Sequence, residues 1–317
     1  MFDVIALGEA LIDFACISTD EDNYPTMAAH PGGAPANFLA ALQKYGAKTT
    51  FISRVGDDAF GKMLIGTLAK AGIDTSGVYV DADTFTTLAF VTFNDEGDRE
   101  FSFARKPGAD TQISKETLRY DLIDAAKVFH FGTLSLTDDP AREATYDAVR
   151  YAKEHGKLIT CDPNLRKPLW SSLDEAKKQI EWSLSMADVV KISDDEVEFL
   201  FGDISYEDAA KKMMEEFGIK LVFITLGKNG CYFANAKGSG RVPGITGLKT
   251  IDTTGAGDIF GGTAVCKLLQ NGKAPEALEP TEIEAIARFA CTAASLSTTR
   301  PGGIFSVPEE SEVQAYL

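Results

Sequence analysis

Residues 34–71, APANFLAALQKYGAKTTFISRVGDDAFGKMLIGTLAKA, contain a helical pattern, a short apolar run and a second helical pattern in succession. Apolar residues in 34–45 and 60–71 recur as on one face of a helix, whereas 48–53 has the length and composition of a buried strand. The apolar run at 4–7 precedes this stretch. Strands that alternate with helices are typical of βαβ units, so this part of the chain predicts a parallel sheet.

The alternation continues towards the C-terminus. Further strands are predicted at 127–131, 157–161, 189–192 and 220–225, and further helices at 140–155, 206–217, 255–270 and 281–297. We therefore expect an α/β fold, with a doubly wound, mostly parallel sheet flanked by helices, as a single domain over residues 1–317.

Two stretches break the alternation. Residues 11–18, 86–93 and 100–105 have strand patterns with no helix between them, and a tight turn at 94–97 joins the last two. They predict a small sheet that stands apart from the main one, a lid formed by about residues 11–30 and 84–106. The exposed face of such a lid is also a candidate contact between subunits, so we expect a homodimer through the lid.

Composition narrows the class of protein. A chain of 317 residues that is 44% hydrophobic can bury a large core, and its net charge of −16 disfavours nucleic acid and anionic membranes as partners. No apolar run reaches the roughly 20 residues of a membrane span, and the N-terminus lacks a signal-peptide pattern, so we expect a cytoplasmic protein. The five scattered cysteines contain no Cys-x-x-Cys pair and are expected to be reduced and mostly buried.

A glycine-rich segment, Asp252-Thr253-Thr254-Gly255-Ala256-Gly257-Asp258, opens the helix predicted at 255–270. Glycines at a helix start leave backbone N–H groups open to an anion, such as one that gathers charge during phosphoryl transfer. Asp258 is placed beside these amides, where a carboxylate can take the proton of an attacking hydroxyl group. A structural alternative stays open, in which Asp258 only favours the positive end of the helix and the glycines only turn the chain.

Two competing motifs are weaker. Residues 56–63, GDDAFGKM, resemble a Walker A loop, but Met63 stands where Ser or Thr must bind magnesium, so we reject this assignment. Gly255 and Gly257 also resemble a dinucleotide fingerprint. Gly261 comes one residue too late for that motif, and no βαβ unit with a ribose-binding acid follows, so a dehydrogenase is disfavoured.

A second cluster, Gly32-Gly33-Ala34-Pro35-Ala36-Asn37, opens the helix predicted at 34–45. Paired glycines allow close approach of a ligand, and the Asn37 amide can both donate to and accept from a sugar hydroxyl. Asp13 adds a carboxylate of the kind that binds vicinal hydroxyls. The alternative is an ordinary helix start with an incidental Asn.

Together these motifs resemble the signatures of a known family. GGAPAN at 32–37, running to GDDAFG at 56–61, resembles the first signature of the ribokinase (PfkB-type) carbohydrate kinase family, and DTTGAGD at 252–258 resembles its second. The resemblance covers nearly the whole chain. Within the family, REFSFARKPGAD at 99–110 and CDPNLR at 161–166 look most like bacterial fructokinases. The resemblance implies a ribokinase-like fold and an ATP-dependent sugar kinase, with D-fructose to D-fructose 6-phosphate as the preferred reaction.

The resemblance also implies roles for individual residues. It makes Asp258 the catalytic base. It places the anion hole at Gly255, Ala256 and Gly257, and the sugar contacts at Asp13, Gly32, Gly33, Asn37, Arg105 and Arg166. Two structural alternatives stay open here, a surface charge on the lid for Arg105 and a structural ion pair for Arg166.

The implied cofactors are ATP and Mg²⁺. Lys191 is expected near phosphate, and the implied nucleotide-side contacts are Lys191, Ser193, Glu196, Thr225, Gly227 and Gly230. The family's Asn-x-x-Glu motif, which organises magnesium-bound water, reads Ser193-Asp194-Asp195-Glu196 here, so Glu196 fits whereas Ser193 replaces the Asn. A potassium site is implied as well, at Asp252, Thr254, Ser297, Gly302 and Ser306.

Three alternatives to a fructokinase stay open. Ribose and 2-keto-3-deoxygluconate are alternative substrates within the family, and the second is an acid that would need an additional cation in the pocket. A non-catalytic sugar-binding protein on the same fold would be expected to lose the base, and the intact Asp258 argues against it.

Overall fold

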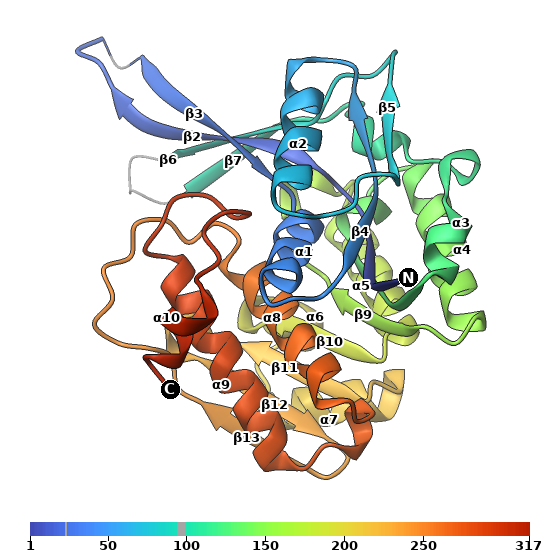
Figure 1. Cartoon of the computed structure of the whole chain (residues 1–317), viewed down its shortest axis with the longest axis vertical. Helices are drawn as coiled ribbons and strands as arrows, with labels where there is room; N and C mark the ends of the chain where they lie inside the picture. The colour runs from blue at the N-terminus through green and yellow to red at the C-terminus, as the bar shows by residue number, and fades with distance from the viewer. Residues whose placement is uncertain (23, 94–98) are drawn as a thin grey trace.

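A nine-stranded sheet runs through the centre of the computed structural model, which describes every residue except 23 and 94–98 (Figure 1). All neighbouring pairs from β11 to β5 are parallel, and β12 and β13 extend the sheet antiparallel at one edge. The strand order is β13 (Gly238–Val242), β12 (Cys231–Asn235), β11 (Leu221–Thr225), β10 (Val189–Ser193), β9 (Leu158–Asp162), β8 (Ala126–Gly132), β1 (Phe2–Leu7), β4 (Thr49–Gly56) and β5 (Val78–Asp81).

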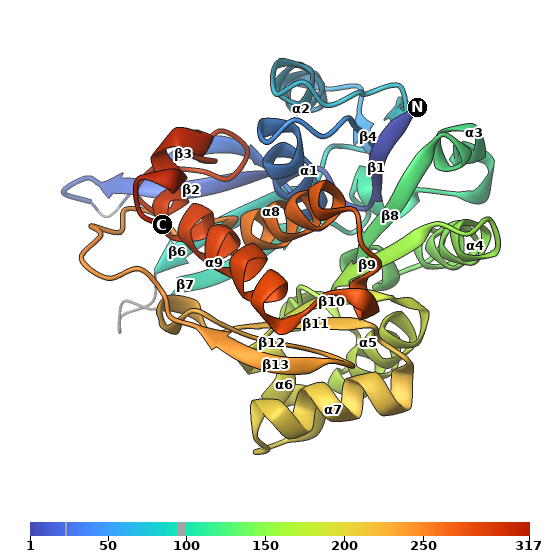
Figure 2. The same ribbon diagram turned by 60° about the horizontal axis from the view of Figure 1, so that its bottom comes forward.

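Helices cover both faces of this sheet (Figures 1 and 2). One layer contains α1 (Ala34–Lys44), α2 (Ala59–Lys70), α8 (Ala256–Asn271), α9 (Pro280–Ser297) and the short α10 (Glu310–Gln314). The other contains α3 (Tyr120–Asp124), α4 (Ala141–Glu154), α5 (Leu173–Met186), α6 (Asp194–Phe201) and α7 (Tyr206–Phe217). The central strands are apolar on both sides because each side packs on helices: Ile5 of β1 belongs to the core of the second layer and Val4 to that of the first.

A separate four-stranded sheet projects from the main body, to the upper left in Figure 1. Its order is β3 (Pro25–Gly32), β2 (Leu11–Thr19), β6 (Leu88–Phe93) and β7 (Arg99–Ala104). The main chain enters this sheet directly from β1 and returns directly into α1. Because the small sheet is joined to the main sheet by such short connections, the position of one constrains the position of the other.

The α/β fold predicted from the sequence is confirmed. All six predicted strands of the main sheet and all six predicted helices are present, within a few residues of the expected bounds. The prediction missed the strands β3, β5, β12 and β13 and the helices α3, α5, α6 and α10. The turn predicted at 94–97 lies outside the described residues.

Two expectations from composition can be compared with the structure. Within the described part of the chain, none of the helices has the length and apolar character of a transmembrane span. Each of the five cysteines is a free thiol, buried in four cases and partly exposed at Cys16.

Candidate active site

A cavity of about 1130 Å³ lies at the carboxyl ends of the parallel strands, next to the small sheet. Main-sheet residues in its lining include Lys191 on β10 and Thr225 at the end of β11, whereas Asp13 and Phe103 come from the small sheet. Ligands of open α/β sheets bind at this edge. The volume exceeds that of most single small-molecule sites, which leaves room for two substrates.

The start of α8 forms one wall of the cavity. Gly255 is its N-cap residue, with a φ of 74° that favours glycine, and no side-chain cap of this helix is found among the described residues. Asp258, in the first turn, is half-buried at the wall of the cavity, and burial raises the pKa of its carboxyl group. The Lys191 ammonium, a hydrogen bond from Asn37 and the charge of Arg166 oppose that rise.

The two glycine-rich motifs meet at this carboxylate. Asn37 of α1 donates a hydrogen bond from Nδ2 to Oδ2 of Asp258, 2.9 Å away, across 221 residues of sequence. The Oδ1 atom of Asn37 is buried without a hydrogen-bond partner in the described structure. A Cβ atom at Gly255 would lie 3.0 Å from the Asn37 amide nitrogen, so a side chain at Gly255 would press on this contact.

Lys191 lies close to the start of α8. Its Nζ lies 3.0 Å from Oδ2 of Asp162, and both side chains are largely buried. A Cβ atom placed on Gly257 would lie 2.9 Å from this Nζ, so the glycine lets the ammonium approach the helix start closely. Burial raises the pKa of Asp162 to about 7 although the charge of Lys191 opposes the rise, and the Oδ1 atom of Asp162 has no partner in the described structure.

The predicted sugar contacts, apart from Arg105, gather in and around the lining of the same cavity. Asp13, Gly33 and Asn37 line the cavity, and Gly32 packs against the Asp13 carboxylate. Burial and the charges of Asp258 and Asp252 raise the pKa of Asp13 to about 7, while Arg166 lowers it. The structure therefore places Arg166, which also lines the cavity, within electrostatic reach of both Asp13 and Asp258.

Arg105 is placed differently from the other predicted sugar contacts. It lies outside the cavity lining, and its side chain is only 2% exposed, so it is not a surface charge either. It donates from Nε to Asp110, from Nη1 to Thr137 and from Nη2 to the carbonyl oxygen of Leu134. The sequence pattern marked a charged residue at the end of a lid strand, but it could not reveal that a buried acid five residues later takes up its guanidinium group.

On the nucleotide side, Thr225, Gly227, Ser193 and Glu196 line the cavity. Gly230 does not: it turns the chain with a φ of 96°, in a position where a side chain would collide with the backbone near Val242. Ser193 and Glu196 form a capping box at the start of α6. Serine therefore performs a helix-capping role at the position where the family has Asn.

The loops predicted to bind potassium lie side by side. Asp252 accepts from the amide and hydroxyl of Thr254 through Oδ1, and from the amide of Gly302 through Oδ2. Ser297 and Ser306 donate their hydroxyl groups to nearby carbonyl oxygens. Among the described residues, no group of three or more His, Cys, Asp or Glu side chains is arranged to hold a metal ion.

Sequence analysis missed several residues of the lining. Glu9 follows β1 and Asn164 follows β9, so the rule that ligands bind at the carboxyl ends of parallel strands could have identified both. Asn164 has a φ of 50°, a left-handed conformation rare for a residue other than glycine. By contrast, the Walker A-like stretch lies elsewhere, and its Asp58 caps α2 by accepting from Phe60 and Gly61.

A phosphoryl-transfer enzyme needs a base beside the attacking hydroxyl and backbone donors for the charge on the transferred group. The start of α8 has a carboxylate, Asp258, beside uncapped backbone amides at the edge of a mostly parallel sheet, an arrangement that fits the class of small-molecule kinases. Residues 1–310 match the sequence pattern described as pfkB family carbohydrate kinase. The chain belongs to this family of ATP-dependent sugar kinases.

Individual relatives agree with this assignment. Fructokinase-2 of Solanum lycopersicum is 41% identical over 318 residues, which cover 99% of this chain and 95% of the relative. The structure of a fructokinase with bound ATP from Xylella fastidiosa superposes with a TM-score of 0.90 at 30% identity, covering 99% of this chain and 98% of that one. A fructokinase double mutant from Vibrio cholerae, with fructose, ADP and potassium bound, has a TM-score of 0.85 at 29% identity and covers 100% and 98% of the two chains.

Proposed function

We propose that the protein transfers the γ-phosphoryl group of ATP to D-fructose and forms D-fructose 6-phosphate. The observation that carries this proposal is the hydrogen bond from Asn37 to Asp258. It joins the start of α1, whose motif suits a sugar, to the proposed base at the uncapped start of α8. The similarity to fructokinases over nearly the full chain supports fructose as the acceptor.

In this proposal Asp258 accepts the proton of the sugar hydroxyl as the phosphoryl group is transferred in line. Asn37 orients the carboxylate, and burial keeps it more basic than an exposed Asp. The amides of Gly255, Ala256 and Gly257 stabilise the charge that builds on the phosphoryl oxygens. Lys191, next to Gly257, adds a positive charge on the same side.

The sugar is held by Asp13, Gly33 and Asn37, with Gly32 supporting Asp13. Asp13 accepts hydrogen bonds from sugar hydroxyls, and Arg166 lies close enough to assist it or to contact the transferred phosphate. Arg105 lies outside the cavity lining, so it is not among the residues that hold the sugar in this proposal. The small sheet acts as a lid over about residues 11–30 and 84–106, and it excludes water that would otherwise hydrolyse ATP.

ATP occupies the side of the cavity lined by Lys191, Thr225 and Gly227. Magnesium bound to the phosphates would be held through water by Glu196, whose two carboxylate oxygens already accept from the amides of Leu165 and Ser193. A potassium ion would be held by oxygen atoms of the loops around Asp252 and Gly302, where it would orient the amides of the α8 start.

We also propose a homodimer that pairs through the exposed face of the small sheet. The strands β2 and β3 extend away from the helical layers (Figure 1), which leaves that face open to a second copy. A cytoplasmic location fits the five free thiols. Analytical ultracentrifugation, with Ile17 changed to Asp on β2, tests the dimer: the substitution is expected to yield monomers.

A coupled ADP-release assay with Mg-ATP tests the function. Fructose, ribose, glucose, adenosine and 2-keto-3-deoxygluconate are offered in parallel, with and without potassium. We expect fructose to give the highest kcat/KM and potassium to raise it. Faster turnover of another sugar would keep the kinase and replace the substrate, whereas no turnover with any of the five would contradict the proposed function.

A further inference from the structure

Glu9 lies where the main sheet passes into the small sheet, and the proposed function gives it no role. It follows β1, precedes β2 and lines the cavity, yet its side chain is almost fully buried. Burial raises the pKa of its carboxyl group to about 7, against the lowering effect of two backbone N–H groups, those of Glu9 itself and of Ala34. A buried acid that lines an active-site cavity must have compensating interactions.

One compensating interaction is the start of α1. The N-cap residue of this helix is Gly33, which has no side chain, and the first turn contains no acidic residue. Glu9 fills that role from 25 residues away, because its Oε1 accepts from the amide of Ala34 at 2.9 Å. The partial positive charge of the helix start favours a carboxylate there. Gly33, with a φ of 109°, lets the two backbones touch, since a Cβ atom would collide with the carbonyl oxygen of Glu9.

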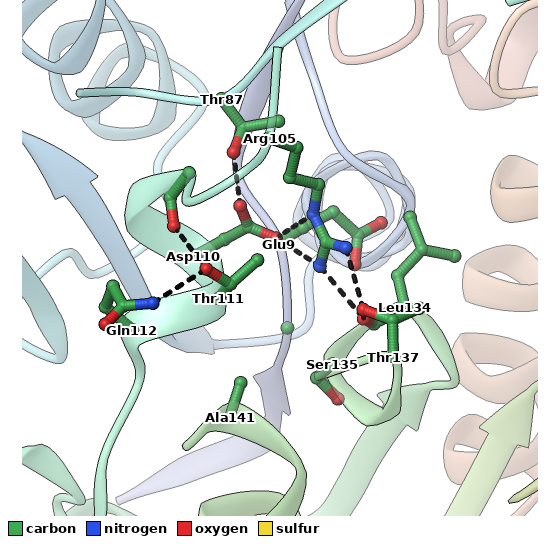
Figure 3. A network of polar contacts seen from close by, with 12 residues as sticks. Glu9, Thr87, Arg105, Asp110, Thr111, Gln112, Leu134, Ser135, Thr137 and Ala141 are labelled. Atoms are coloured by element: carbon green, nitrogen blue, oxygen red, sulfur yellow. Dashed lines mark hydrogen bonds and ion pairs between the residues drawn. The ribbon is translucent and has the colours of Figure 1, made fainter. Parts of the chain in front are cut away.

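A buried ion pair, Arg105 with Asp110, lies close to Glu9 (Figure 3); the charge of Asp110 raises the pKa of Glu9 and that of Arg105 lowers it. The ion pair has an Nη2–Oδ2 distance of 2.7 Å, and both side chains are 2% exposed. Asp110 also accepts from the hydroxyl of Thr87, the residue that precedes β6. Arg105 follows β7, so the polar network formed by Thr87, Arg105 and Asp110 holds both strands of the β6–β7 hairpin together beside Glu9.

The cap formed by Glu9 bears on the sugar site through α1. Asn37 lies one turn after Gly33, its amide donates to the carbonyl oxygen of Gly33, and its side chain holds Asp258. A shift of the helix start would therefore displace Gly33 and Asn37 together. The residues on the ATP side stand on β10 and at the end of β11, whereas α1 packs on β1, β4, β8 and α8. A shift of α1 would disturb them less.

We propose that Glu9 is a positioning residue of the sugar site, which caps α1 and thereby fixes Gly33 and Asn37 relative to the connection between β1 and β2, where the small sheet begins. The inference rests on the proposed function, since it concerns the affinity of the same site for its sugar. It also places Arg105 beside this cap, as the counter-charge of Asp110.

Steady-state kinetics of two substitutions test the proposal. Glu9→Ala removes the cap and the charge, and we expect kcat/KM for the sugar to fall about tenfold to hundredfold, with the KM for ATP changed less than about twofold. Glu9→Gln keeps an oxygen that can accept from Ala34, and we expect it to restore kcat/KM to within about fivefold of the wild type. Glu279→Ala is the matched control, because Glu279 caps α9 outside the cavity.

The outcomes separate positioning from other roles. Equal losses in Glu9→Ala and Glu9→Gln would overturn the proposal, because they would make the charge of Glu9 a direct requirement of the sugar. Equal rises in the KM for sugar and ATP, or an effect no larger than that of Glu279→Ala, would do the same. If Glu9→Ala does not fold, sugar-induced thermal stabilisation of Glu9→Gln without ATP decides: we expect it to be retained, and its loss contradicts the capping role. Failure of the wild type to turn over any sugar would instead contradict the proposed function.

Discussion

Helices α1 and α8 both begin at a glycine and both point their N-termini into the same cavity, yet their first turns are used differently. At α1 the amide of Ala34 is occupied by the Glu9 carboxylate. At α8 no side-chain cap is found among the described residues, and the nearby cation Lys191 adds to the positive potential. The first start is therefore closed to an added anion, and the second is available to one.

The difference shows that a glycine-led helix start does not define an anion site by itself. The sequence signal at 32–37 and that at 255–258 are alike, and what distinguishes them is an acid 25 residues away from one of them. In the proposed function a neutral sugar therefore binds at the capped start and the transferred phosphoryl group at the uncapped one. Substitutions at the two starts should have different consequences.

The largest effect is expected at the uncapped start. Asp258→Asn keeps an oxygen that accepts from Asn37 but removes the base, so we expect kcat to fall about 10²- to 10⁴-fold. The sugar KM should change little, because Asp13, Gly33 and Asn37 stay in place. Burial raises the pKa of Asp258, so removal of its charge should not lower the melting temperature at neutral pH. A variant with a tenth of wild-type turnover would show that Asp258 is not the base.

The next largest effect is expected when Lys191 is kept from approaching the uncapped start of α8. In Gly257→Ala the added Cβ atom would lie 2.9 Å from the Lys191 Nζ and would push it away, so we expect kcat to fall about tenfold to hundredfold. Gly66→Ala in α2 is the control, because a Cβ atom there meets nothing within 4 Å. The control should stabilise the protein by about 0.5–1 kcal/mol and leave kcat unchanged. Full activity of Gly257→Ala would remove Lys191 from the proposed mechanism.

A smaller effect, which changes the pH dependence of activity, is expected when Asp162, the ion-pair partner of Lys191, is substituted. In Asp162→Asn the positive charge of Lys191 is no longer balanced, and it should lower the pKa of Asp258. Since the proposed function requires Asp258 in its ionised form, kcat/KM is expected to fall as pH drops through the pKa of Asp258. The acid limb of the pH profile should therefore move to lower pH, and kcat should fall about tenfold because the base is weaker.

Asp188→Asn is the control for this pH shift. Asp188 and Lys220 form a similar pair, 3.0 Å apart, but neither lines the cavity. The control should leave the acid limb in place. An unmoved limb in Asp162→Asn, or a limb that moves to higher pH, would contradict the electrostatic link between Lys191 and Asp258.

The main sheet was predictable because its signals are local. A buried parallel strand such as β1 has a short apolar run, and a helix such as α4 has a clear face, so neither needs knowledge of its neighbours. β13 reads GSGRV and has no strand pattern of its own, and it forms because β12 offers an edge to pair with. β5 is a four-residue edge strand, too short for its alternation to be recognised.

The residues of the candidate site also divide into those that have a local sequence signal and those that do not. Asp258 and Asn37 lie in glycine-rich motifs with recognisable spacing, so the sequence indicated them, and the structure brings them into contact. Arg105 was expected at the sugar because the family resemblance implied that contact. Its buried partners Asp110, Thr137 and Leu134 could not be inferred from the sequence, because a guanidinium group can bind partners in any direction that the fold supplies.

The smallest effect is expected at a third helix start that faces the cavity, that of α6. Here Ser193 caps the helix with its own hydroxyl and Glu196 closes the capping box, so this start resembles α1 in being closed. Ser193→Ala should lower the free energy of unfolding by about 1 kcal/mol. It should change kcat by no more than about twofold, because Glu196 keeps its hydrogen bond from the amide of Leu165. Urea unfolding and the magnesium dependence of turnover measure the two effects. If Ser193→Ala instead raised the magnesium requirement as strongly as Glu196→Gln does, the hydroxyl of Ser193 would serve the metal rather than the helix, and α6 would have to be grouped with the uncapped start of α8.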